Sequence, residues 1–216
     1  MPQLRLFPLH IVLFPGMPLG LHIFEERYKQ LINECLRDGE PFGVVAIRRG
    51  SEVGDPAPDL FDVGTAAHIL QVEPLDEGRM NIVGVGQARF RIEHLYTDRP
   101  YLYADVEYLH LRDQRDPSLP ALMNRVGLLL HRYLDVLRQA DLVKGGGHEL
   151  PGDPVSLAYL AAYVLQIPDE QKQVLVEENS LPALLHRLAD MYRRELPLVQ
   201  VLLSPPPHEP MPFSEN

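Results

Sequence analysis

The stretch Val63–Val85, VGTAAHILQVEPLDEGRMNIVGV, indicates how the first half of the chain folds. Branched and apolar residues run from Val63 to Leu75, and residues 76–79, Asp-Glu-Gly-Arg, have the composition of a turn. Met80–Val85 is again rich in β-forming residues, so the stretch predicts two antiparallel strands joined by a short turn.

Shorter segments on either side of this hairpin also have strand character. Their apolar residues alternate with polar or small ones, or form a short continuous run, in Leu4–Leu6, Leu19–Ile23, Phe42–Ile47, Phe90–Leu95 and Leu102–Tyr108. Several short strands at this spacing predict a closed or nearly closed barrel.

One helix is predicted among the strands. Tyr28, Leu31, Ile32, Cys35 and Leu36 are spaced as one face of a helix. Gly39 stands where a left-handed residue would end that helix.

After about residue 115 the apolar period changes to that of helices. The predicted helices are Leu119–Leu137, a segment capped by Asp153 and running to Leu165, Gln171–Glu177, and a segment that follows Ser180. Pro197 predicts that the last helix kinks or ends near Glu195. The fold class is therefore α+β, with a β-barrel subdomain over residues 1–112, a helical subdomain over 113–203, and a Pro-rich tail, 204–216, expected to be disordered.

Composition narrows the classes of partner. The chain has 216 residues, 45% of them apolar, and a formal net charge of −10. That charge argues against nucleic acid and against an anionic membrane surface as partners. The single cysteine, the absence of a basic N-terminal region and the absence of a long apolar run lead us to expect a soluble cytoplasmic protein.

The sequence offers few residues with the spacing of a catalytic, cofactor or metal site. No phosphate-binding loop motif occurs, and Gly84-Val85-Gly86 is expected to form a bend between two strands. The nine histidines form no ligand pair, and Cys35 lies on the apolar face of its helix. We therefore expect no catalytic residue, no cofactor and no metal.

Three motifs resemble a known family. The first is Leu6–Glu25, which contains Leu6-Phe7-Pro8-Leu9 and Phe14-Pro15-Gly16-Met17-Pro18. The second is Asp59–Leu70, and the third is Val83–Ile92, with Gly84 and Arg89 in the family pattern. In this order they resemble the N-terminal domain of the Lon ATP-dependent proteases. A weaker helical similarity runs from Asp153 to Leu188.

The resemblance implies a pseudo-barrel of the PUA-like kind followed by a helical bundle. In the full-length proteases this domain helps to select and hold substrates, whereas the ATPase and peptidase work belongs to other domains. No Walker motif or serine–lysine peptidase segment occurs in this sequence, so we expect a stand-alone, non-catalytic member of the family.

The leading hypothesis for function is a module that binds polypeptide, either unfolded segments or a partner protein. Leu13, Phe14 and Met17 are the candidate contact residues, because prolines keep residues 13–18 out of a central strand. The alternative for these side chains is that Phe14 and Met17 pack the end of the barrel. Other open interpretations are a small-molecule pocket, an unrecognised enzyme, a structural or assembly subunit of a protease system, and a weak homo-oligomer.

Overall fold

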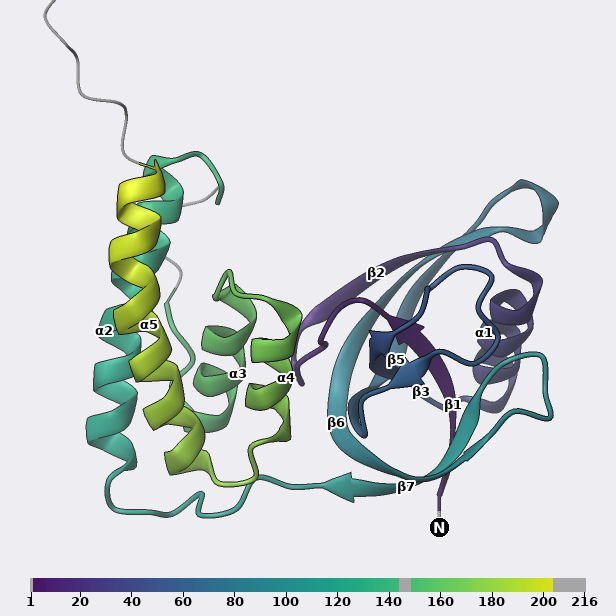
Figure 1. Cartoon of the computed structure of the whole chain (residues 1–216), viewed down its shortest axis with the longest axis horizontal. Helices are drawn as coiled ribbons and strands as arrows, with labels where there is room; N and C mark the ends of the chain where they lie inside the picture. The colour runs from purple at the N-terminus through teal and green to yellow at the C-terminus, as the bar shows by residue number, and fades with distance from the viewer. Residues whose placement is uncertain (1, 144–148, 204–216) are drawn as a thin grey trace, which may run out of the picture.

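The computed structural model describes residues 2–143 and 149–203, which form two lobes side by side (Figure 1). The first lobe holds all the strands together with α1, and the second holds α2 to α5. The predicted tail, 204–216, lies outside the described residues. Within the described ranges, no helix is both long and apolar enough to cross a membrane.

Five strands of the first lobe close into a ring. The order is β1 (Gln3–Leu9), β7 (Tyr103–Leu109), β6 (Met80–Tyr96), β5 (Val63–Pro74) and β3 (Phe42–Arg49), and β3 then pairs with β1. The closing pair, β1 with β3, is parallel, whereas the other pairs of the ring are antiparallel. A closed ring that combines one parallel pair with antiparallel pairs, followed by helices, confirms the expected pseudo-barrel and the α+β class.

Three smaller elements complete the barrel lobe. β2 (Pro18–Ile23) pairs with β6 outside the ring, and β4 (Asp59–Leu60) pairs with β3. α1 (Glu26–Asp38) buries Tyr28, Leu31, Ile32 and Cys35 of its predicted apolar face, whereas Leu36 is exposed, and it ends at Gly39, which has a φ of 68°. The predicted left-handed helix end is therefore confirmed.

β6 differs from the prediction of two separate strands. Met80–Tyr96 is one strand of 17 residues, and Gly84-Val85-Gly86 lies inside it rather than between two strands. The expected bend is present: Ala66 pairs with Ala88 and Ala67 pairs with Gly86, which leaves Gln87 as an extra residue. This bulge lets β6 curve through the ring without ending.

The second lobe packs its helices around one apolar core. Its helices are α2 (Leu119–Gln139), α3 (Pro154–Val164), α4 (Asp169–Glu177) and α5 (Leu181–Leu203). The cap of α3 is as predicted, because the Asp153 carboxylate accepts a hydrogen bond of 2.8 Å from the Ser156 backbone N–H. The Ser180 hydroxyl, expected to cap α5, donates to the Asp113 carboxylate at 2.8 Å.

The prediction for α5 was a kink or an end near Glu195, and the end is wrong, because the helix continues through Pro197 to Leu203. Pro197 is on the exposed side of the helix, whereas Leu196 is buried and Val199 and Leu203 pack against the helical core. Packing of this apolar face offsets the hydrogen bond that the proline cannot donate.

Candidate functional site

A cavity of about 460 Å³ lies between the two lobes, and we call it the interlobe cleft. Its walls come from the Pro15–Met17 loop, the bulged part of β6, the chain just after β7, and the first two turns of α3. Concave sites of this size between subdomains are common positions for ligands and peptides.

The loop before β2 is fixed to the β6 bulge by backbone hydrogen bonds. The Gly16 N–H donates to the Gly86 carbonyl at 2.8 Å, and the Gly86 N–H donates to the Met17 carbonyl at 3.0 Å. A Cβ at position 86 would lie 2.5 Å from the Phe14 carbonyl oxygen, so only glycine lets the loop approach this closely. The wall of the cleft that carries Met17 is therefore held in place.

The three predicted contact residues have different environments. Leu13 and Phe14 are buried, with exposed fractions of 5% and 0%, and the Phe14 ring lies 6.3 Å from the Tyr159 ring. In this structure neither side chain is open to a partner, and Phe14 packs into the core of the helical lobe where that lobe meets the barrel. Met17 is partly exposed and lines the interlobe cleft.

The side chains around the cleft are mainly apolar. The apolar and aromatic side chains are those of Met17, Leu109, Leu111, Val155, Tyr159 and Leu160, and the polar side chains are those of Gln87, Arg89, His110, Gln114 and Ser156. Burial raises the pKa of Tyr159, so its phenol stays neutral at physiological pH. This lining, which in the described part of the chain includes no carboxylate, suits an apolar segment better than acid–base chemistry.

Arg89, at the base of the cleft, joins the lobes. Its side chain is 1% exposed, and its Nη1 donates to the carbonyls of Val176 at 2.7 Å and Glu178 at 2.6 Å. These carbonyls stand at the C-terminal end of α4, where the helix dipole favours a cation. Burial lowers the pKa of Arg89 from its ordinary value, but the group remains a cation at neutral pH.

Further hydrogen bonds cross the same interface. The Gln173 side chain donates to the Val63 carbonyl at 2.9 Å, and the backbone of Arg112 pairs with Asn179 and Leu181. The arrangement of the two walls of the cleft therefore follows from several buried polar contacts and not from the apolar core alone.

The role of Arg89 was not predicted, although it lies in the third family motif. Along residues 80–86 of β6, buried and more exposed side chains alternate, and continuing this pattern would place Arg89 on the exposed side. The extra residue Gln87 reverses the alternation after the bulge, so Arg89 is buried instead. A bulge signal at Gly84-Val85-Gly86 was the one feature of the sequence that could have indicated this change.

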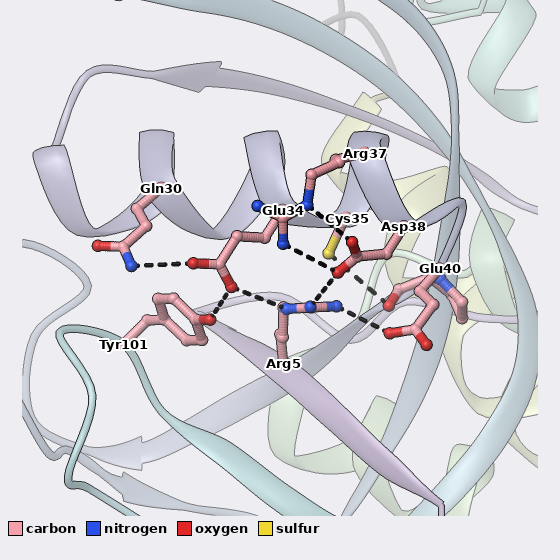
Figure 2. Close-up of polar contacts among 9 residues, drawn as sticks. Arg5, Gln30, Glu34, Cys35, Arg37, Asp38, Glu40 and Tyr101 are labelled. Carbon is pink, nitrogen blue, oxygen red and sulfur yellow. Dashed lines mark hydrogen bonds and ion pairs between the residues drawn. The ribbon is translucent and has the colours of Figure 1, made fainter.

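A second polar cluster lies on the opposite side of the barrel lobe, where α1 meets β1 (Figure 2). The Arg5 guanidinium is 3.3 Å from Glu34, 2.5 Å from Asp38 and 2.9 Å from Glu40, and the Tyr101 hydroxyl donates to Glu34. The hydroxyl of Tyr101, followed by the amide of Gln30, holds the pKa of Glu34 below its ordinary value. The cluster clamps the end of α1 to the barrel.

Cys35 lies beside this cluster but is not reactive. Its side chain is 1% exposed, and burial raises the pKa of the thiol to about 11. A neutral, buried thiol is a poor nucleophile, which agrees with its predicted role in packing. Within the residues that the structure describes, no three His, Cys, Asp or Glu side chains converge as metal ligands would.

The comparisons with known proteins agree with this two-lobed arrangement. Residues 3–194 match the family model of the ATP-dependent protease La (LON) substrate-binding domain. The chain is 29% identical to Lon protease 2 of Myxococcus xanthus, in a match that covers 93% of this chain and 24% of the relative. It is 28% identical to the Lon protease of Anaeromyxobacter dehalogenans, in a match that covers 88% of this chain and 23% of the relative. It thus spans about a quarter of the curated relatives that it matches.

Two solved structures share the fold. The Lon N-terminal domain protein from Xanthomonas campestris superposes with a TM-score of 0.64 at 26% identity, covering 88% of this chain and 98% of that one. The N-terminal domain of the Mycobacterium avium complex Lon protease has the same TM-score at 17% identity, and the superposition covers 89% of this chain and 98% of that one.

Proposed function

The chain belongs to the family of the Lon protease substrate-binding domain, and from this premise we propose that it is a polypeptide-binding module. The proposed site is the interlobe cleft, with Met17 as a contact residue. The family match concerns the substrate-binding part of those proteases, so the proposal assigns no ATPase or peptidase step to this chain.

The observation that carries the proposal is the cleft itself. It combines about 460 Å³ of space with a mainly apolar lining, a few hydrogen-bonding side chains and the Arg89 guanidinium at its base. Such a surface binds side chains that leave water readily, and its polar side chains can hydrogen-bond the peptide backbone.

The chemistry of the cleft favours unfolded over folded clients. Folded proteins bury most of their large apolar side chains, whereas an unfolded segment presents them together with unpaired backbone groups. The cleft is recessed between two lobes, so a side chain must project from a flexible or extended segment in order to enter it.

Fluorescence anisotropy of a labelled, permanently unfolded polypeptide, titrated with this protein in the absence of ATP, tests the proposal. The natively folded counterpart of that polypeptide, carrying the same label, is the control. We expect saturable binding of the unfolded form alone. Equal binding of both forms, or no binding at tens of micromolar protein, would contradict the proposal and favour a dedicated partner, a small ligand or an assembly role.

A further inference from the structure

We infer that the client is bound as an added β-strand along the free edge of β2, and that it places a Lys or Arg side chain in an acidic pocket beside that strand. The inference rests on the proposed function, because it states how and by which residues a polypeptide would be recognised. It extends the site from the interlobe cleft along the neighbouring strand.

β2 has an unoccupied edge. Among the described residues it pairs with β6, in the register Pro18↔Val85 to Ile23↔Met80, and with no other strand. β1, which precedes it in the chain, pairs with β3 and β7 instead. Alternate residues of β2 therefore direct their backbone N–H and C=O groups away from the sheet, where an extended peptide can pair with them.

A second cavity, of about 210 Å³, lies along this edge, and we call it the β2 pocket. Residues 20–25 form one side of it, and Phe7, Leu9, Tyr28, Glu52 and Val53 form the rest. Phe24 and Val53 are large apolar side chains with exposed fractions of 47% and 56%. The pocket thus offers apolar contact directly beside the backbone groups of the free edge.

The charge of the β2 pocket is negative. Glu25 and Glu52 both line it, and the nearby Arg27 guanidinium lies 3.1 Å from Glu25. The Arg27 Nη1 donates to the Asp55 carbonyl at 2.6 Å and its Nη2 to the Glu52 carbonyl at 3.0 Å, while the Glu52 carboxylate accepts from the backbone N–H of His10. The β2 pocket therefore holds two carboxylates, and Arg27 forms an ion pair with one of them, Glu25.

His22 and Tyr28 also line the β2 pocket. His22 hydrogen-bonds Asn81 at 2.8 Å and stacks on Phe24 with 5.9 Å between ring centroids. An acidic rim over apolar walls fits a Lys or Arg side chain, whose methylene stem packs on apolar surface while its charged head pairs with a carboxylate. The Phe24 face adds a favourable position for a cation.

The interlobe cleft and the β2 pocket are continuous along the chain. The cleft is lined by Pro15–Met17, which lead directly into β2, and the pocket begins at Gly20. At about 3.3 Å per residue, Met17 and Phe24 are separated by about 23 Å, the length of a strand of about seven residues. We therefore assign the site to short extended segments with apolar residues toward one end and a basic residue toward the other.

Synthetic peptides of ten residues with a neutral dye provide the test. The parent peptide carries leucine and valine in one half and two lysines in the other, and its partner has glutamates in place of the lysines. We expect the glutamate peptide to bind about tenfold more weakly. N-methylation of one alternate set of backbone nitrogens should abolish binding, whereas methylation of the other set should be tolerated, because one set faces β2.

Protein variants locate the effect. In the double variant Glu25→Gln/Glu52→Gln, the preference for lysine over glutamate should fall to about twofold or less. Glu26→Gln is the matched control, because the Glu26 side chain is 89% exposed and does not line the β2 pocket. Amide hydrogen exchange of the wild-type protein should slow at β2 when the lysine peptide is bound, which is a readout that needs no variant.

The outcomes separate the two proposals. If the unfolded polypeptide binds but the lysine and glutamate peptides bind equally, and both N-methylated sets behave alike, strand addition at β2 is overturned and the proposed function stands. If neither the unfolded polypeptide nor any peptide binds, the proposed function fails, and the inference fails with it.

Discussion

Arg89 is one of the residues whose buried hydrogen bonds join the two lobes. It is a buried cation that bonds to the end of α4 from the middle of β6, and its Nε has no hydrogen-bond partner among the described residues. Burying a guanidinium with one unpaired nitrogen costs free energy. Its other hydrogen bonds are directional and therefore define the relative position of β6 and α4 more closely than apolar packing does.

We predict that Arg89→Ala lowers the free energy of unfolding by about 3 kcal/mol, because it removes charge-assisted hydrogen bonds and leaves the Val176 and Glu178 carbonyls without donors. Urea unfolding measures this change. Arg91→Ala is the control on the same strand: its partner Glu107 is 3.7 Å away and both side chains are largely exposed, so a loss of less than about 0.5 kcal/mol is expected. Equal losses would mean that Arg89 is not a clamp.

The cluster of Arg5, Glu34, Asp38 and Glu40 makes the attachment of α1 sensitive to acid. The pKa of Glu34 is lowered from 4.5 by the Tyr101 hydroxyl first, and that of Asp38 is lowered from 3.8 by Arg37 and then Arg5. A carboxyl whose pKa is lower in the folded state contributes stability above its unfolded pKa. That contribution is lost as the pH falls through the folded pKa.

Tyr101→Phe tests this dependence while keeping the buried ring. We predict that it raises the pKa of Glu34, followed by NMR of the side-chain carboxyl, and lowers stability near pH 7. The difference in stability from the wild type should shrink below about pH 4.5. Tyr96→Phe, which removes a hydroxyl bonded to Asp105 at 2.8 Å, should raise the pKa of Asp105 and leave that of Glu34 unchanged. A stability difference that stays constant with pH would contradict the assignment.

Among the elements, α5 shows that tertiary packing can extend a helix past a proline. Its last turns hold Leu196, Val199 and Leu203 on the core side, with Pro197 and Leu198 on the exposed side. Pro197 supplies no N–H for the helical hydrogen bond, so residues beyond it depend on side-chain packing for their helical state.

Pro197→Ala should therefore make the end of α5 more stable. We predict slower amide hydrogen exchange at residues 198–203 and a higher overall stability, by about 1 kcal/mol, because alanine restores the missing donor. Pro182→Ala provides the comparison, since Pro182 stands in the first turn of α5, where its N–H would have no helical partner. Unchanged exchange at residues 198–203 would show that Pro197 does not limit this part of the helix.

At the scale of the whole molecule, much of the fold could be predicted from local patterns. The change from alternating to helical periodicity near residue 115 predicted strands followed by helices, and Gly39 and Asp153 were recognised as helix boundaries. The parallel pairing of β1 with β3 could not be derived in this way, because it joins segments about 37 residues apart and depends on the whole ring.

The candidate site was predicted less well, for physical reasons. Leu13 and Phe14 have the apolar character of contact residues, but the same character buries them: Leu13 in the core shared by the barrel and α1, and Phe14 in the core of the helical lobe. The cleft needs residues from β6, α3 and the chain after β7, and nothing in local spacing indicates that these segments meet.

The most direct test of the central claim compares two variants in their affinity for the labelled unfolded polypeptide. Met17→Asp places a charge in the interlobe cleft, and Leu198→Asp places one on the exposed side of α5, where Leu198 has an exposed fraction of 56%. We predict that Met17→Asp weakens binding at least about tenfold, since a desolvated charge would oppose an apolar segment, and that Leu198→Asp binds like the wild type. Equal affinity of the two folded variants would contradict the claim that the interlobe cleft holds the polypeptide.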